Sequence, residues 1–157
     1  SARGSQSWAV RDHASALAPG KRPRLTPNPA LAIRPGKSVM PFGTPGGDNQ
    51  NQANVQVLLN MELFGMTPQE ATEAPRFMTH SQPNSFSPHQ AYPGKLTVEG
   101  RVDEATTDAL SGRGHDVERL PDLTWKTAGV CLVRKDLKSG IIDSGADPRR
   151  PSRAMGR

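Results

Sequence analysis

Two adjacent glycines join a short apolar segment to a strongly helical one, and this junction constrains the fold more than any other stretch. The junction, residues 43–48, reads Gly-Thr-Pro-Gly-Gly-Asp and follows the apolar residues 39–42. Beyond it, apolar residues recur at helical spacing from Ala53 to Phe64. The sequence therefore predicts a strand, a glycine turn and a helix in that order. Asp48 is expected to cap the helix, because its carboxylate can accept free backbone N–H groups.

The paired glycines, Gly46 and Gly47, also suit this turn to ligand binding. Glycine adopts backbone conformations closed to other residues and lets a ligand approach bare N–H groups. Such donors at the positive end of a helix suit an anion or a developing oxyanion. On this stretch alone, a tight turn with no ligand is the simpler interpretation, since short glycine motifs are weak evidence.

Composition limits the classes of protein to consider. The chain has 157 residues, enough for one domain, and its 15 glycines and 15 prolines indicate a loop-rich fold or part of a larger one. A net charge of +5 permits acidic partners without requiring them. The single cysteine, Cys131, excludes an internal disulfide and lies in an apolar run, so we expect it to be buried and inert.

No targeting or metal-binding signal stands out in the sequence. No apolar run approaches the length of a membrane span, no signal peptide is visible, and the compartment stays open. His80 and His89 lack the spacing and the acidic or cysteine neighbours of a metal site. We therefore expect no metal and no cofactor.

The remaining patterns predict an α+β chain, with an antiparallel sheet that carries helices on one face. A loop-rich lead-in, residues 1–20, comes first, and a basic tail, residues 147–157, comes last and is expected to be surface or subunit-contact sequence. Thr67 to Glu70 form a predicted capping box for a short second helix that ends before Pro75. The other elements are expected as strands at 30–33, 38–43, 95–99, 115–120, 128–134 and 141–146, and as helices at 49–64, largely buried, and 102–113, with one apolar face.

Two further features have a simple explanation. Ser1 could in principle be an N-terminal nucleophile, but an arbitrary terminus is the preferred interpretation. The basic residues of 21–24 could contact nucleic acid, but no aromatic residues interleave with them for base stacking, so a solvated or substrate-side loop is preferred.

The long loop, residues 79–94, is either a surface excursion or a functional lid.

Several motifs in a fixed order give the chain a family resemblance. They are Gly20-Lys21-Arg22-Pro23-Arg24-Leu25-Thr26-Pro27, the glycine turn, Thr67-Pro68-Gln69-Glu70-Ala71-Thr72-Glu73-Ala74-Pro75-Arg76-Phe77, Gly114-His115 and Ala146-Asp147-Pro148-Arg149-Arg150. In this order, from about residue 17 to the end, the chain resembles the C-terminal part of the small subunit of gamma-glutamyltransferases (gamma-glutamyltranspeptidases), including their cephalosporin-acylase-like bacterial relatives.

The resemblance implies a fold and a chemistry. These enzymes are N-terminal nucleophile hydrolases, four-layered αββα sandwiches built from two chains that arise by self-cleavage of one precursor. Cleavage exposes a threonine that attacks a γ-glutamyl or related amide, and water or an amine then takes the acyl group. The expected partners are therefore a large subunit or upstream segment of the same precursor and a small amide substrate.

The resemblance also assigns residues. Gly46 and Gly47 correspond to the paired oxyanion-hole glycines, and Thr44 is expected beside them at the substrate wall. Leu25 and Thr26 fall where the family carries two serines that hold the substrate carboxylate. Thr26 keeps a hydroxyl, whereas Leu25 cannot donate a hydrogen bond, so a related amide or acyl substrate is an alternative to a true γ-glutamyl group.

The family's Thr-Thr-His-like opening is absent from this chain, so the nucleophile is expected to lie outside it. Three hypotheses follow. The chain belongs to an amide-cleaving or acyl-transferring enzyme, to a catalytically silent relative kept for interaction, or to a basic nucleic-acid-binding protein. The intact glycine turn favours the first, and a partner polypeptide with a free N-terminal threonine would separate it from the second.

Overall fold

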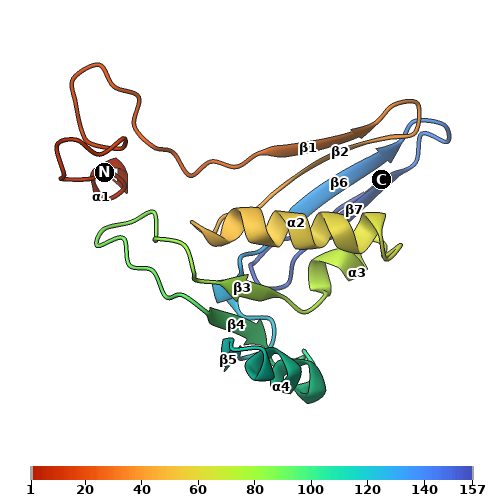
Figure 1. Cartoon of the computed structure of the whole chain (residues 1–157). Helices are drawn as coiled ribbons and strands as arrows, with labels where there is room; N and C mark the ends of the chain where they lie inside the picture. The colour runs from red at the N-terminus through yellow and green to blue at the C-terminus, as the bar shows by residue number, and fades with distance from the viewer. Residues whose placement is uncertain (1, 157) are drawn as a thin grey trace.

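A computed structural model describes the backbone of residues 2–156 and the side-chain surroundings of residues 4–156. Ser1 lies outside the described residues, so its interpretation as an arbitrary terminus stays a prediction. The molecule consists of two sheets with helices packed beside them (Figure 1). The α+β class predicted from the sequence is confirmed.

The larger sheet has four antiparallel strands in the order β1-β2-β6-β7. They are β1 (Ala30–Arg34), β2 (Ser38–Gly43), β6 (Cys131–Asp136) and β7 (Ile142–Ala146). The two hairpins were predicted from turn residues, and Gly36 and Gly140 do adopt positive φ in them. The strand expected at 128–134 begins three residues later, because Ala128 to Val130 turn away to reach the glycine turn described below.

Two helices, α2 (Asn49–Glu62) and α3 (Pro68–Glu73), cover one face of this sheet (Figure 1). The capping box of α3 is confirmed, since Thr67 and Glu70 exchange hydrogen bonds with each other's backbone N–H groups. The core between helices and sheet contains small and flexible apolar side chains: Met40, Ala53, Val57, Met61, Ala71, Met78, Ala128, Val130 and Leu132.

The prediction that α2 is largely buried holds for the side that faces the sheet and is wrong for the outer side. Ala53, Val57 and Met61 face the sheet, but Val55 and Leu59 on the outer side are exposed. Apolar residues occupy both sides of this helix, whereas the described residues supply cover for only one.

The second sheet has three strands, β3 (Phe77–Thr79), β4 (Lys95–Glu99) and β5 (Asp116–Leu120). β4 pairs antiparallel with β3 and parallel with β5, and α4 (Glu104–Gly112) forms the crossover between the parallel strands. The sequence pattern missed β3, which is too short to show a period. The predicted apolar face of α4 is also not buried: only Thr107 is, because the helix packs on β5 at the edge of the molecule (Figure 1).

The N-terminal end of the chain agrees with expectation, whereas the C-terminal end does not. The lead-in is loop-rich, as predicted, with one short helix, α1 (Ala2–Ser5), while a 3₁₀ turn, η1 (Trp125–Thr127), precedes β6. The start of the tail, expected at the surface, is instead part of the interior. Asp147 is 0% and Arg149 5% exposed, because each finds an oppositely charged partner there.

The second face of the larger sheet has no cover among residues 2–156. Alternation along the strands directs Leu31, Ile33, Val133 and Ile142 to the exterior, where all four are exposed. Cys131 is also exposed, so the expectation of a buried cysteine is wrong. Within the described part of the chain, no helix is long and apolar enough to cross a membrane.

Candidate functional site

The glycine turn places two backbone N–H groups where they have no internal acceptor. Gly46 and Gly47 have φ of +145° and +57°, conformations that favour glycine. Their carbonyl groups are used, since the N–H groups of Asn49 and Gln50 donate to them at 3.1 and 3.3 Å as α2 begins. Among residues 2–156, neither glycine N–H donates a hydrogen bond within the chain. Two adjacent donors are therefore free to bind an oxygen atom from elsewhere.

Asp48 follows the glycines at the cap position, but its carboxylate does not cap the helix. It accepts two hydrogen bonds from Ser85 instead, from the backbone N–H at 2.7 Å and from the hydroxyl. The predicted role of Asp48 is thus corrected. The carboxylate ties the loop of residues 80–93 to the glycine turn, because Ser85 is buried and offers two convergent donors.

The segment 126–130 packs directly against the turn and supports its shape. The Thr44 hydroxyl accepts a hydrogen bond from the Gly129 N–H at 2.8 Å and donates to the carbonyl of Pro45. A Cβ placed on Gly46 would lie 3.0 Å from the Ala128 Cβ, so only glycine fits there without displacement. The Thr44 hydroxyl is therefore fully engaged within the turn.

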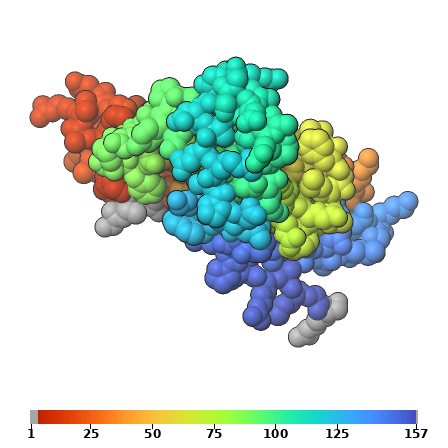
Figure 2. Space-filling model, turned by 90° about the horizontal axis from the view of Figure 1, so that it is seen from below, coloured from red at the N-terminus to blue at the C-terminus, as the bar shows by residue number. Residues whose placement is uncertain are grey.

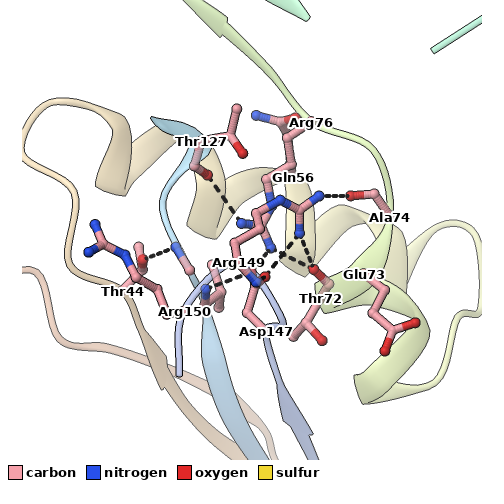
Figure 3. A network of polar contacts seen from close by, with 12 residues as sticks. Thr44, Gln56, Thr72, Glu73, Ala74, Arg76, Thr127, Asp147, Arg149 and Arg150 are labelled. Atoms are coloured by element: carbon pink, nitrogen blue, oxygen red, sulfur yellow. Dashed lines mark hydrogen bonds and ion pairs between the residues drawn. The ribbon is translucent and has the colours of Figure 1, made fainter. Parts of the chain in front are cut away.

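Behind this segment lies a cluster of buried charges, here called the buried ion network: Arg76, Glu99, Asp147 and Arg149. Figure 3 shows Arg76, Asp147 and Arg149 close together, with Thr44 to one side. Two positive and two negative groups balance within it. Such balance is required, because an unpaired charge in the interior is strongly destabilising.

Arg149 uses all five of its N–H donors. The Nε and Nη2 atoms donate to the two carboxylate oxygens of Glu99 at 2.6 and 2.5 Å, and Nη1 donates to Asp147 at 3.1 Å. The other two donors reach the carbonyl oxygens of Thr72 and Ala74 at 2.7 and 2.8 Å. The tail is thereby fastened to the end of α3 and to β4.

Arg76 and Asp147 carry the network to the segment beside the turn. Arg76 Nη2 donates to Asp147 at 2.5 Å, and its Nη1 donates to the carbonyl of Thr127 at 3.1 Å. The same Asp147 oxygen accepts the N–H of Val130 at 2.9 Å. A continuous set of hydrogen bonds therefore runs from the network through residues 127–130 to Thr44 and the glycine turn.

The surroundings shift the pKa values of these groups in opposite directions. Burial raises the pKa of Glu99, but hydrogen bonds from Arg149 and Thr127 outweigh it and hold that pKa below its usual value. Burial lowers the pKa of Arg76, and Asp147 only partly opposes this. For Arg149 burial also acts to lower the pKa, but Glu99 and Asp147 raise it above its usual value. The charged forms of Glu99 and Arg149 stabilise each other.

Leu25 and Thr26 are linked to the turn by the residues that follow them in the chain. Leu25 is exposed and Thr26 half-buried. Three residues after Leu25, the carbonyl oxygen of Asn28 lies 3.6 Å from the position of a Cβ on Gly43, and its side-chain amide donates to Asn51 on α2. Within the described residues no hydrogen bond joins Leu25 or Thr26 to the turn. Groups of His, Cys, Asp and Glu that could hold a metal are also absent from that part of the chain.

Comparison with known proteins agrees with this architecture. A model of the family described as gamma-glutamyltranspeptidase matches residues 2–157. The glutathione hydrolase-like YwrD proenzyme of Bacillus subtilis is 32% identical over 98% of this chain and 28% of its own length. The oxamate amidohydrolase proenzyme of Klebsiella pneumoniae is 34% identical over the same shares of the two chains.

A solved structure gives the same result. The chain resembles the cephalosporin acylase from Bacillus halodurans with a TM-score of 0.73 and 26% identity, over 94% of this chain and 25% of that one. The chain belongs to the gamma-glutamyltranspeptidase family, as the ordered motifs predicted. It spans about 28% of the length of the curated relatives it matches.

No pattern in the sequence indicates the buried ion network or Ser85 directly. Arg76, Asp147 and Arg149 do lie within the ordered motifs, which was the one available signal. The contacts that assemble the network, however, join residues far apart in the chain: Glu99 is 50 residues from Arg149, and Arg76 is 71 from Asp147. A period or a local motif cannot reveal a contact of that range.

Proposed function

We propose that this chain is the C-terminal part of the small subunit of an N-terminal nucleophile hydrolase that cleaves, or transfers the acyl group of, a γ-glutamyl or related amide. The single observation that supports the proposal most is the glycine turn, whose two N–H groups have no acceptor among the described residues. Membership of a family whose curated relatives include hydrolase and acylase proenzymes supplies the reaction class.

In this proposal Gly46 and Gly47 form the oxyanion hole. Attack on an amide carbonyl places negative charge on its oxygen, and two rigid N–H donors stabilise that charge more than they stabilise the neutral carbonyl. The donors need no rearrangement during the reaction, because the segment 126–130 and the start of α2 hold the turn on both sides. The nucleophile is a threonine outside this chain, with its own α-amine as base.

Leu25, Thr26 and Thr44 define the substrate wall in the same proposal. Thr26 offers a hydroxyl to the distal end of the acyl group, whereas exposed Leu25 offers only apolar surface. Thr44 contributes indirectly: its hydroxyl accepts the Gly129 N–H and thereby fixes the turn. A leucine in place of a hydrogen-bond donor favours an acyl group with less polarity than a glutamyl α-carboxylate and ammonium.

The fold of the complete enzyme is proposed to be the four-layered αββα sandwich. The exposed face of the larger sheet, with Leu31, Ile33, Val133 and Ile142, is a large apolar surface of the kind that a second sheet covers. Such a sheet would come from the large subunit or an upstream segment of the same precursor. The whole of this chain, residues 1–157, would then be one portion of a larger domain.

The first test is native mass spectrometry of the complete gene product that contains this chain, with N-terminal sequencing of every polypeptide present. The proposal expects a second polypeptide or an upstream segment that begins with threonine, together with release of p-nitroaniline from γ-glutamyl- or glutaryl-p-nitroanilide. A folded chain of 16.9 kDa alone, with no such threonine, would contradict it. A catalytically silent interaction subunit would then be the better explanation.

A second test addresses the acyl group. Leu25→Ser restores a hydroxyl at the position where the family carries serine, so the ratio of kcat/KM for γ-glutamyl- over glutaryl-p-nitroanilide should rise by about tenfold or more. Leu17→Ser, at another exposed leucine of the lead-in, is the matched control and should leave the ratio unchanged. An unchanged ratio in Leu25→Ser would remove Leu25 from the substrate wall.

A further inference from the structure

The loop of residues 80–93 packs on the glycine turn and is fixed there. Ser85 is buried, and it donates its backbone N–H and its hydroxyl to Asp48, the residue that follows Gly47. At the base of the loop, the N–H of His80 donates to the carbonyl of Lys95, and the N–H of Tyr92 donates to that of His80. The loop is therefore held at its base and near its centre.

The lead-in supports the loop from the other side. The ring of Trp8 stacks on that of His89 with centroids 4.2 Å apart, and the N–H of Ser87 donates to the carbonyl of Ser5 at 2.7 Å. Figures 1 and 2 both show the lead-in beside this loop. Because the loop is tied to the turn on one side and covered on the other, its side chains have defined positions rather than a range of them.

Phe86 is the residue that this arrangement places against the turn. Its Cε2 atom lies 3.5 Å from the position that a Cβ on Gly47 would take. The Phe86 backbone is held as well, since its N–H donates to the Asn84 side chain and its carbonyl accepts from the N–H of His89, both at 2.8 Å. An aromatic ring is thus held beside one of the two proposed oxyanion-hole glycines, close enough to touch a Cβ at that position.

We infer that Phe86 is a specificity-determining residue, an apolar wall that limits the width of the acyl group next to the scissile carbonyl. The inference rests on the proposed function. An oxygen bound at about 3 Å by the Gly47 N–H brings its carbonyl carbon close to that residue. A ring held this close to Gly47 therefore reaches the substituents on the neighbouring acyl carbon. Asp48 and Ser85 act as positioning residues for this ring.

The test compares two substrates in the processed enzyme. The reference is whichever of γ-glutamyl- and glutaryl-p-nitroanilide the wild type cleaves faster, and the probe is the same compound with a methyl group on the carbon next to the scissile carbonyl. Wild type should disfavour the probe by at least about tenfold, because a rigid pocket rejects one extra methyl by roughly that factor. Phe86→Ala should reduce this discrimination by about tenfold through improved kcat/KM for the probe.

Two further variants keep the result interpretable. Phe86→Leu preserves apolar packing with a smaller side chain, so it should fold and shift the ratio in the same direction, though less. Tyr92→Ala changes an exposed aromatic residue of the same loop and should leave the ratio at its wild-type value.

Three outcomes would overturn the inference. The first is an unchanged ratio in Phe86→Ala and Phe86→Leu with active wild type. The second is an equal loss on both substrates, which indicates a structural role only. The third, a wild type that cleaves neither reference compound, would overturn the proposed function together with the inference, so the two failures are distinguishable.

Discussion

The guanidinium of Arg149 and the carboxylate of Glu99 form a two-point ion pair in the interior, with N–O distances of 2.6 and 2.5 Å and both side chains 0% exposed. The pair joins the tail of the chain to β4, and Thr127 adds its hydroxyl to the same carboxylate at 2.6 Å. Parallel two-point geometry is the strongest arrangement available to these groups. Arg149 thus stabilises the region next to the segment 126–130, which packs on the glycine turn.

Arg149→Lys is expected to destabilise the protein although it keeps the charge. Lysine has three donors on a single nitrogen, so it cannot serve the five acceptors that surround Arg149. The carbonyl oxygens of Thr72 and Ala74 would compete for the remaining donors, at a cost of about 1–3 kcal/mol in the free energy of unfolding. Urea unfolding of the complete protein measures this. Arg153→Lys, at an exposed position of the tail, is the control, and an equal effect there would contradict the prediction.

The ion pair also predicts how stability depends on pH. The folded-state pKa of Glu99 lies below its unfolded value, so its contribution is complete above about pH 4.3 and is lost as pH falls through the folded-state pKa. Wild type should therefore lose stability on acidification below about pH 4.3. Glu99→Gln should be less stable at pH 7 and should show a shallower slope, because that carboxylate no longer takes up a proton. Urea unfolding at pH 7, 4 and 3 tests this, and equal slopes would show that Glu99 is not the group responsible.

The sequence predicted the parts of the fold that local chemistry determines. The capping box at Thr67 and Glu70 requires only residues three apart, and it is present as predicted. The hairpin at residues 34–37 and the strand–turn–helix around Gly46 depend on equally local signals, and these elements are also present. Membership of the family followed from the order of the motifs rather than from any one of them.

The errors concern contacts between distant residues. Asp48 was expected to cap α2, but its carboxylate accepts from Ser85, 37 residues away. The tail was expected at the surface, whereas Arg149 finds Glu99 and Asp147 inside. Cys131 was expected inside, because an apolar run does not reveal which face of its strand is covered. Each of these outcomes depends on tertiary packing that a single sequence does not encode in a readable pattern.

Two glutamines of α2 block the free edge of β3. Gln56 exchanges hydrogen bonds with both the N–H and the carbonyl of Phe77, at 3.1 and 2.9 Å, and Gln52 does the same for Thr79. Gln56→Glu keeps the shape but loses the donor, so the Phe77 carbonyl would face a carboxylate. We expect a loss of about 1–3 kcal/mol in the free energy of unfolding.

The same change at exposed Gln82 is the control for this prediction and should have little effect. Amide hydrogen exchange gives an independent readout, because opening of the β3 edge should raise the exchange rate of Phe77 specifically. Stability and exchange equal to wild type in Gln56→Glu would show that the glutamine contacts contribute nothing to the edge.

Substitutions at Thr44 should separate an effect on catalysis from an effect on folding. Thr44→Val removes the acceptor of the Gly129 N–H but keeps the volume, so the turn loses one of its supports. If Gly46 and Gly47 form the oxyanion hole, kcat should fall about tenfold with little change in KM, since only transition-state stabilisation is affected. Thr44→Ser keeps the hydroxyl and should retain most of the activity. A larger effect on KM than on kcat would instead place Thr44 in direct contact with the substrate.

The two glycines of the turn should differ in their tolerance of alanine. At Gly46 the new Cβ would lie 3.0 Å from the Ala128 Cβ, in a backbone conformation that alanine rarely adopts. At Gly47 the contact with Phe86 is an ordinary 3.5 Å, so the main cost is the left-handed φ of +57°, about 1–2 kcal/mol. Gly46→Ala should therefore reduce kcat by about a hundredfold, through displacement of the donors, and Gly47→Ala by less.

Gly140→Ala provides the matched control for both glycines, because its φ is +75° and no other group lies within 4 Å of its Cβ position. It should cost stability in the same range as Gly47→Ala but leave kcat unchanged, since the turn between β6 and β7 lies at the opposite end of β2, where Asp136 pairs with Ser38, whereas the glycine turn follows Gly43, which pairs with Cys131. A hundredfold loss of kcat specific to Gly46→Ala would tie catalysis to the close packing of Gly46 on Ala128. Equal kcat values in all three variants would exclude the glycine turn as the oxyanion hole.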